Sequence, residues 1–239
     1  MEIKNINGYE FLTFQNDCAE IVFSTSKQGL NLNKNLNIGL ENLDKVKGFF
    51  KLDNIEYLNQ IHSDIIYSYN EKSIKELDGD SIITNKRNIG IGIFTADCVP
   101  VIIVDNKEKV IAAIHSGWKG TYEKIVLKTI NKMVKDYNIN PKDLSIYIGP
   151  HNRSCCYEVS QELIEKFKNL DIYKNININQ GRYLDLEKCI FAQLALIGVE
   201  KENINTIKLC TYCCENYKLY SYRKIDEREG RLFSFVYMK

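Results

Sequence analysis

The pattern of apolar and polar positions predicts a chain that mixes buried strands with amphipathic helices. Three apolar runs, at residues 89–94, 99–104 and 110–114, are short and rich in β-branched side chains, which favours strands over helices. Other short apolar segments predict further strands, over residues 145–148, 207–209 and 232–237. The central part of the chain is therefore predicted to form a sheet with little solvent exposure.

Apolar residues at helical spacing predict helices between and after these strands. One helix is expected over residues 122–137, and a second over 160–167 with Ser160 as its N-cap. A third is expected over 186–197, where Gly198 suits the left-handed end of a helix. Because helices and strands alternate without a regular β-α-β rhythm, we predict an α+β fold, with one domain over residues 1–239 and mixed β-sheets flanked by helices.

Composition and charge exclude several classes of partner. The 239-residue chain has a formal net charge of +1, so no global basic field attracts nucleic acid or an anionic membrane. Its N-terminal residues do not resemble a secretory signal, and no apolar stretch reaches the ~20 residues of a membrane-spanning helix. Eight cysteines are too few for a disulfide scaffold, so we expect a cytoplasmic protein with a local pocket for a small substrate.

Two histidines and one cysteine lie beside predicted strands and carry the candidate chemistry. His62 closes a strand-like segment, Cys98 lies in the break between two apolar runs, and His115 follows a third run. Two imidazoles and one thiolate form a three-ligand zinc shell that leaves one position open for water or substrate. Two alternatives stand beside this hypothesis: satisfied histidines with a buried thiol, or Cys98 as a nucleophile with His115 as its base.

The remaining cysteines allow a second metal hypothesis. Cys210 and Cys213 form a C-x-x-C followed by Cys214, and the adjacent pair Cys155–Cys156 could complete a four-thiolate structural site. Only one C-x-x-C is present, and an adjacent pair suits a shared metal poorly, so we expect core thiols or pocket walls instead. Cys18 and Cys189 are expected in the core. His151, next to Gly149-Pro150, is expected to be a loop residue and not a fourth ligand.

Several short motifs, in a fixed order, resemble those of the laccase-domain family, also called the YfiH or polyphenol oxidase family. The resemblance spans nearly the whole chain after about residue 20, although it is weak before residue 55. Its motifs are Asn-Gln-Ile-His62, Asp80-Ser-Ile-Ile-Thr84, Thr95-Ala-Asp-Cys98-Val-Pro, His115-Ser-Gly-Trp118-Lys-Gly, Gly149-Pro150, Cys155-Cys156-Tyr157-Glu158-Val159, Arg182-Tyr183-Leu184-Asp185-Leu186, Leu209-Cys210-Thr211, Tyr220-Ser221-Tyr222-Arg223 and Gly230-Arg231.

The resemblance implies a zinc enzyme that phosphorolyses purine nucleosides. By family analogy, His62, Cys98 and His115 are the zinc-binding and catalytic positions, and adenosine, inosine or methylthioadenosine and phosphate are the substrates. Adenosine deamination is implied as a second activity. Ser116 stands where the family commonly has Ala. Lys27 and Lys119 stand where Arg is frequent; if either binds phosphate, lysine keeps the charge but loses the bidentate geometry.

Other residues near the motifs suggest supporting roles. Asp97 and Asp80 are candidates for orienting a ligand imidazole or contacting substrate, and Asp80 also for moving a proton, with an ordinary turn aspartate as the alternative for each. Lys119 is a further candidate substrate contact. Trp118 and Tyr157 are candidate walls for a purine ring, with plain core packing as the alternative. Arg223 is a candidate phosphate contact, with an ordinary surface ion pair as the alternative.

Two other enzyme classes remain open alternatives. Family descriptions include a copper-dependent phenol oxidase, but three histidines are too few for a multicopper cluster, so zinc is preferred over copper. Family names also include a peptidoglycan-editing factor, which would use Cys98 as the nucleophile of a hydrolase. The remaining alternative is a non-enzymatic scaffold protein, which would have no metal and no pocket.

Overall fold

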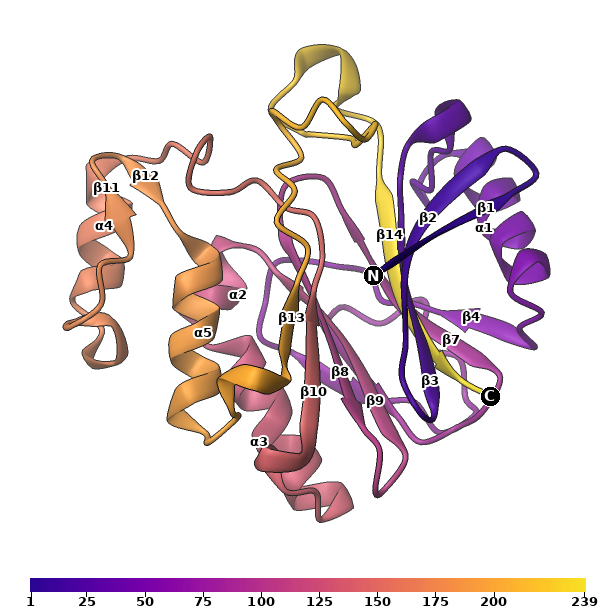
Figure 1. Cartoon of the computed structure of the whole chain (residues 1–239), viewed down its shortest axis with the longest axis horizontal. Helices are drawn as coiled ribbons and strands as arrows, with labels where there is room; N and C mark the ends of the chain where they lie inside the picture. The colour runs from indigo at the N-terminus through magenta and orange to yellow at the C-terminus, as the bar shows by residue number, and fades with distance from the viewer.

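The computed structural model describes residues 1–239 and is built around two six-stranded sheets (Figure 1). The first sheet is antiparallel except where β4 pairs with β7. Its strands, in spatial order, are β1 (Glu2–Ile6), β2 (Tyr9–Gln15), β3 (Ala19–Ser24), β14 (Leu232–Met238), β7 (Ile89–Thr95) and β4 (Asn54–Glu56). The first and last strands of the chain therefore lie in one sheet, where β14 pairs with β3 and β7.

The second sheet is also mixed. Its parallel pairs are β5 with β6 and β10 with β13, and the other neighbours are antiparallel. Its strands, in spatial order, are β13 (Ile204–Thr206), β10 (Leu144–Ile148), β8 (Val99–Asp105), β9 (Val110–Ser116), β6 (Ser81–Thr84) and β5 (Ile66–Ser68). A separate two-stranded ribbon consists of β11 (Asn179–Gln180) and β12 (Tyr183–Leu184).

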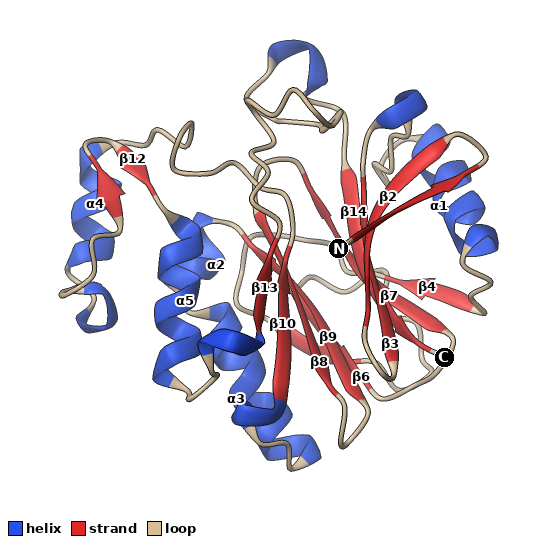
Figure 2. Cartoon of the chain, viewed as in Figure 1, coloured by secondary structure: helices blue, strands red, loops and turns tan.

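The two sheets pack on each other, and helices cover their outer faces (Figure 2). Ile91 and Val236 of the first sheet share one buried cluster with Ile102 and Ala113 of the second. Helix α1 (Asn37–Phe49) packs on the outer face of the first sheet. The outer face of the second is covered by α2 (Trp118–Tyr122), α3 (Ile125–Tyr137) and α5 (Leu186–Leu196), with α4 (Gln161–Lys168) beyond them. Strands β8 and β9 are buried on both faces, which is why their sequences are continuous apolar runs.

The structure confirms the predicted mixture of helices and mixed sheets and most of its elements. The strands near residues 89–94, 99–104, 110–114, 145–148 and 232–237 are present. The N-cap is confirmed too: Ser160 Oγ accepts a hydrogen bond from the Leu163 amide at 3.2 Å. Gly198 follows α5 with φ of +87°, as its terminating role requires.

Other predictions were wrong or incomplete. The helix expected over residues 122–137 is present as α3 but begins later, at Ile125, because Lys124 takes a left-handed conformation with φ of 62° and separates it from the short α2, which ends at Tyr122. The strand expected over 207–209 lies instead at Ile204–Thr206. The prediction also missed β1 to β3 and α1, all of which precede residue 50.

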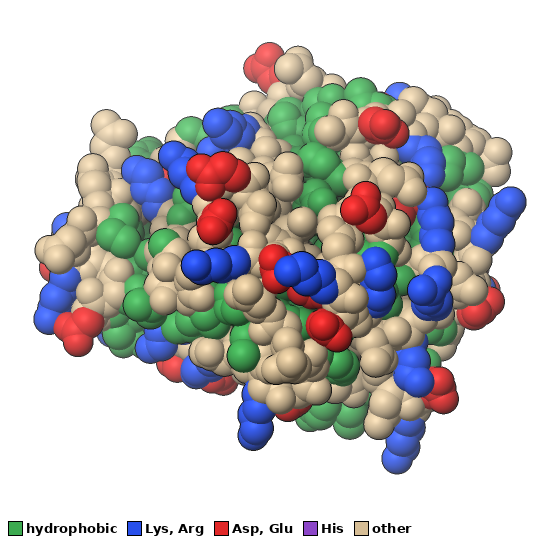
Figure 3. All heavy atoms as spheres, turned by 60° about the horizontal axis from the view of Figure 1, so that its bottom comes forward, with side chains coloured by type: hydrophobic (Ala, Val, Ile, Leu, Met, Phe, Trp, Pro, Cys, Tyr) green, Lys and Arg blue, Asp and Glu red, His purple; other side chains and the backbone are tan.

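The surface carries no single-sign patch on the face shown in Figure 3, where acidic and basic side chains are interspersed. This agrees with the small net charge of the chain. No helix in the structure combines the length and the apolar character needed to cross a bilayer.

Candidate metal centre and substrate pocket

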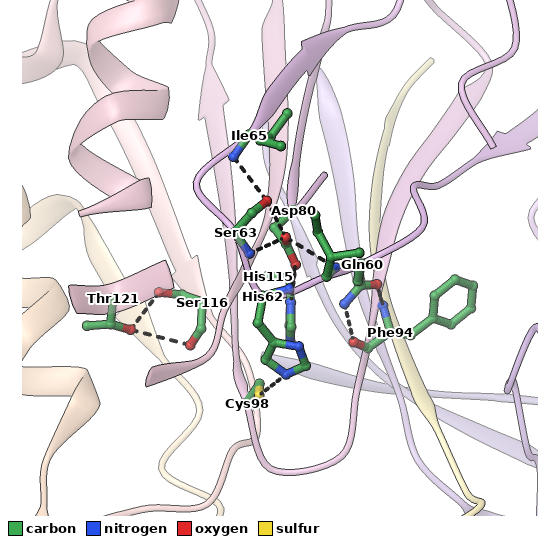
Figure 4. A network of polar contacts seen from close by, with 11 residues as sticks. Gln60, His62, Ser63, Ile65, Asp80, Phe94, Cys98, His115, Ser116 and Thr121 are labelled. Atoms are coloured by element: carbon green, nitrogen blue, oxygen red, sulfur yellow. Dashed lines mark hydrogen bonds and ion pairs between the residues drawn. The ribbon is translucent and has the colours of Figure 1, made fainter. Parts of the chain in front are cut away.

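The structure brings the side chains of His62, Cys98 and His115 together, and because these three residues could hold a metal ion we call them the metal group. Their potential ligand atoms all lie within 4.8 Å of one another. The Cys98 Sγ atom lies 3.7 Å from His62 Nε2, and the two imidazole centroids are 4.7 Å apart with their planes at 77° (Figure 4). His62 is exposed, Cys98 is half-buried and His115 is only 3% exposed, so the group is rooted in the core and open on one side.

Three different elements position these side chains. His115 is near the end of β9, and Cys98 immediately precedes β8, opposite it in the same sheet. His62 is not at a strand end, as the sequence had suggested, but in the loop between β4 and β5, with φ of 59°. Gly117 lies against the group, since a Cβ there would be 2.9 Å from His62 Cδ2 and 3.0 Å from Cys98 Sγ.

Asp80 holds two of the three residues in place from inside the core. Its buried carboxylate accepts hydrogen bonds from His115 Nδ1 at 2.7 Å, from the His62 amide at 3.1 Å and from the Ser63 amide at 2.6 Å (Figure 4). Burial raises the pKa of Asp80, but hydrogen bonds from His115 and Ser63 outweigh it and lower the pKa overall. An ionised carboxylate only accepts, so His115 carries its proton on Nδ1 and directs Nε2 towards the metal group.

The charges of the group are coupled. Burial raises the pKa of Cys98, but the His115 and His62 imidazoles outweigh it and lower that pKa to about 6. Burial lowers the pKa of His115, but Cys98 and Asp80 reverse this and raise it to about 9. Without a metal, the pair is therefore a thiolate and an imidazolium at neutral pH. The thiolate is the form of Cys98 that binds zinc, whereas His115 must release its Nε2 proton before that nitrogen can bind a metal, so binding would release protons.

Gln60 is a supporting residue to which sequence reasoning assigned no role. Its side-chain amide accepts from the Phe94 amide at 2.7 Å and donates to the Phe94 carbonyl at 2.8 Å. These two bonds fasten the His62 loop to β7. The only sequence signal was the position of Gln60 two residues before His62.

A large cavity of about 1080 Å³ opens beside the metal group. Its wall includes His62, Cys98 and His115. Four basic side chains line it, namely Lys34, Arg223, Arg228 and Arg231, against the two acidic residues Asp97 and Glu158. Aromatic rings also line it, from Phe94, Trp118, Tyr157, Tyr183, Tyr212 and Tyr222. The cavity thus combines flat apolar surfaces with a positive charge suited to an anion.

Four of the six residues expected to contact substrate line this cavity: Trp118, Tyr157, Arg223 and Asp97. Arg223 lies over the Tyr157 ring at 4.6 Å and donates to the backbone carbonyls of Cys156 and Glu158. Asp80 is buried behind His115 and does not line the cavity. Lys119 lies over the Trp118 ring, 5.7 Å from its centroid, and is also absent from the wall.

Asp97, Lys27 and His151 all have structural partners away from the His62–Cys98–His115 group. Asp97 does not reach an imidazole, because its carboxylate accepts from Thr211 Oγ1, Ser221 Oγ and the Arg223 amide. It therefore orients the C-terminal loop of the cavity. Lys27 pairs with Glu10 at 3.1 Å, outside the cavity. His151 is buried away from the metal group, where its Nδ1 donates to the Gly149 carbonyl, as expected for a residue that is not a ligand.

Sequence reasoning assigned a role to only one of the four cations in the cavity wall, and it missed Lys34, Arg228 and Arg231. Lys34 lies in the N-terminal region, where no motif pointed to function, and Arg228 is in no motif. Arg231 belonged to the Gly230-Arg231 motif but had no assigned role. Topology brings these cations to the cavity, since β14, which starts at Leu232, runs beside β3.

A second group of sulfur ligands lies next to the cavity. Cys155, Cys156, Cys210 and Cys213 have all four sulfur atoms within 4.8 Å of one another. The expectation of core thiols or pocket walls agrees with the structure, since Cys155 and Cys156 line the cavity and Cys213 lines a neighbouring hollow. What the sequence did not predict is that the four sulfur atoms lie together. Burial and the neighbouring thiols Cys210 and Cys213 raise the pKa of Cys155 to about 11. Cys189 is fully buried, as predicted, whereas Cys18 is only partly buried.

Comparison with known proteins places these features in context. A family model described as multi-copper polyphenol oxidoreductase laccase matches residues 11–239. A purine nucleoside phosphorylase of Clostridium acetobutylicum is 45% identical over the full length of both chains. An adenosine deaminase, RL5, of an unknown prokaryotic organism is 32% identical over 67% of this chain and 62% of its own. The crystal structure of the Bacillus licheniformis hypothetical protein YfiH superposes with a TM-score of 0.82 at 25% identity, covering 92% of this chain and 93% of that one.

Proposed function

Because the chain belongs to the laccase-like family whose model spans residues 11–239, and its relatives include named purine nucleoside phosphorylases, we propose that it is a zinc-dependent purine nucleoside phosphorylase. Its proposed substrates are phosphate and adenosine, inosine or methylthioadenosine, with adenosine deamination as a second activity, as the name of one relative suggests. The observation that carries the proposal is the His62–Cys98–His115 group in the wall of a cavity that also holds four cations.

The donor set fits zinc better than the copper of the family description. Zinc takes both imidazole and thiolate ligands, and three protein ligands leave the open fourth position that a catalytic zinc site needs. A multicopper cluster needs more imidazoles, and the third histidine of the chain, His151, lies outside the group. A zinc ion held by these residues would supply Lewis acidity towards a substrate oxygen or water. Copper remains the second candidate metal.

The residues around the group have distinct proposed roles. Asp80 holds His115 in the tautomer that directs Nε2 at the metal and fixes the His62 loop. Trp118 and Tyr157 would receive the purine ring, whose stacking contributes ~1 kcal/mol beyond area burial. Arg228 and Arg231 would bind phosphate, and Arg223 would hold the Cys156–Glu158 wall.

The reaction needs these groups in one place. In phosphorolysis a phosphate oxygen forms a bond to the ribose C1′ while the bond from C1′ to the purine nitrogen breaks and the purine gains a proton. The cations would hold the phosphate close to C1′, which replaces a bimolecular encounter by an oriented one. The aromatic walls would hold the departing base.

Product analysis tests the proposal. Zinc-loaded protein given adenosine and phosphate should produce adenine and ribose 1-phosphate, and inosine would report deamination. Omitting phosphate should stop adenine formation but leave inosine formation unchanged. The variant Cys98→Ser should lose both, while Cys18→Ser, a partly buried thiol outside the group, should keep both. Absence of turnover with every purine nucleoside tested would reject the assignment.

A cysteine-dependent hydrolase, as in cell-wall precursor editing, is the second candidate. The favouring observation is that the Cys98 thiol and the His115 imidazole lie in one group whose donor atoms are within 4.8 Å, so that Cys98 could act as a nucleophile with His115 as its base. Metal-free protein would then be the active form towards precursor substrates, and zinc would inhibit it. The opposite response to zinc separates the two candidates.

A further inference from the structure

We propose that Cys155, Cys156, Cys210 and Cys213 bind a structural zinc ion, separate from the His62–Cys98–His115 group. We call these four residues the thiol cluster. Their sulfur atoms lie within 4.8 Å of one another, and Cys155 Sγ is 3.7 Å from Cys213 Sγ. Zinc–sulfur bonds of about 2.3 Å in a tetrahedron place the sulfurs about 3.8 Å apart. A disulfide would require about 2.05 Å instead.

The exposure of the thiol cluster does not fit packing as its purpose. Cys155 and Cys213 are exposed and Cys156 is half-buried; only Cys210 is buried. Free cysteines that serve as small apolar side chains are buried, as Cys189 is here at 0% exposure. A hollow of about 550 Å³, lined by Cys155, Cys210 and Cys213, gives an ion a path to the sulfurs.

Donor groups around Cys210 suit a thiolate. Backbone N–H groups of Arg153, Cys213 and Tyr212 point at this sulfur. Asn152 is 2% exposed, and its Nδ2 has no hydrogen-bond partner, while its Oδ1 is 3.8 Å from Cys210 Sγ. Turning this amide over would let Nδ2 donate to a Cys210 thiolate, which satisfies the orphaned group. Such N–H donors to a ligand sulfur are the usual outer support of a metal site.

The adjacent pair that argued against this site in the sequence is accommodated by a turn. Residues 154–156 form a turn after β10, and residues 211–213 form the turn after Cys210. The two segments are held side by side by the bridge between His151 and Cys210, with the Thr211 amide bonded to the His151 carbonyl. Both cysteines of the pair therefore face the C-x-x-C turn.

A zinc ion at the thiol cluster would stabilise one wall of the substrate cavity. Four protein ligands close the coordination shell, so the site would be structural. Binding forms four zinc–sulfur bonds and releases four thiol protons. The joined segments supply Cys156, Tyr157 and Tyr212 to the cavity, and Arg223 donates to the Cys156 carbonyl. The ion would thus fix the position of Arg223 and Tyr157 without taking part in the reaction.

Metal content of the full-length protein, reduced and loaded with zinc, tests the inference. If both sites fill, the wild type holds two zinc ions per chain, and Cys155→Ser/Cys213→Ser holds one less than the wild type. Both substituted side chains are exposed, so the variant should fold. The matched control is Cys214→Ser, which changes a neighbouring cysteine outside the cluster and should hold as much zinc as the wild type.

The outcome does not depend on the proposed function. If the His62–Cys98–His115 group bound no metal, the wild type would hold one zinc ion and Cys155→Ser/Cys213→Ser none. In cobalt-substituted His62→Ala/Cys98→Ser protein, the thiol cluster should give the intense absorption of tetrahedral cobalt thiolate, which Cys155→Ser/Cys213→Ser should abolish. Equal zinc in the wild type and that double variant, iron or copper in place of zinc, or a disulfide within the cluster would overturn the inference.

Discussion

Substituting Gly117 by alanine should weaken metal binding at the His62–Cys98–His115 group while leaving the fold intact. The added methyl carbon would lie 2.9 Å from His62 Cδ2 and 3.0 Å from Cys98 Sγ. Favourable carbon contacts need about 3.5–4.0 Å, so the ligands must retreat by roughly 0.6 Å or more. The exposed His62 loop is the element free to move.

The expected loss of zinc affinity follows from how little the ligand distances of a metal site can deviate. Ligand distances in such sites stay within about 0.2 Å of their ideal values, which is less than the displacement required here. Disturbing the groups that position metal ligands typically lowers affinity about 10–100-fold, and we expect a loss in that range. Gly117 has φ of −71° and ψ of 178°, which alanine adopts without strain. As an N-cap change it should cost only about 1 kcal/mol of folding free energy.

The assay is zinc competition against a chelating dye, paired with thermal unfolding of the metal-free protein. Gly48→Ala is the matched control, because Gly48 lies in α1 with no atom within 4 Å of the new Cβ. It should leave zinc affinity unchanged and raise stability by about 0.5–1 kcal/mol. Zinc affinity of Gly117→Ala equal to that of the wild type would refute the placement of these ligands.

Three further predictions concern the same site. Asp80→Asn removes the buried negative charge beside His115 and replaces one accepting oxygen by an N–H donor, so it should destabilise the fold by about 3–5 kcal/mol in denaturant titrations and lower zinc affinity. An unchanged midpoint would contradict the role of Asp80. In metal-free protein the Cys98 thiol has a pKa of about 6, so the rate of its alkylation should rise as the pH rises through about 6. The variant His115→Asn removes the main imidazole that lowers this pKa, so it should move the midpoint of the alkylation profile to higher pH. Identical midpoints in the two proteins would count against the ion pair. Arg228→Gln should raise KM for phosphate about tenfold, from the roughly 1.5 kcal/mol of one charged hydrogen bond, with the KM for adenosine unchanged; an effect on adenosine alone would place the phosphate elsewhere.

The parts of the fold that could be predicted are those in which the local sequence itself shows the burial pattern or the end of an element. Strands β7, β8 and β9 are covered on both faces, so their apolar runs are unbroken. The N-cap at Ser160 and the stop at Gly198 are local signals too, and both were read correctly. The pairing of β14 with β3 joins the two ends of the chain and is not a property of either segment alone.

For the candidate site, too, the chemistry of the residues could be predicted from the sequence, whereas their geometry could not. Ligand chemistry identified His62, Cys98 and His115 as residue types, and only folding brings their donor atoms within 4.8 Å. Asp80 read equally well as a turn aspartate until its bonds to His115 and the His62 loop were known. Asp97 illustrates the opposite error, because its closeness to Cys98 in sequence suggested an imidazole partner, whereas its carboxylate faces Thr211 and Ser221.

The thiol cluster shows the limit of spacing rules. The adjacency of Cys155 and Cys156 argued against a shared metal in the sequence. Neighbouring side chains do point to opposite faces in a strand. In the structure the pair lies on a turn, where both sulfurs can point the same way. Sequence spacing therefore predicts a metal site only where the secondary structure of the ligands is known.

The most direct test of the central claim is an anomalous difference map from zinc-loaded crystals, recorded on both sides of the zinc absorption edge. Separately from any peak at the thiol cluster, the account predicts a peak at about 2.0–2.3 Å from His62 Nε2, Cys98 Sγ and His115 Nε2, with no fourth protein ligand and an open side facing the cavity. A map without density among these three side chains, or with a fourth protein ligand closing the shell, would contradict it.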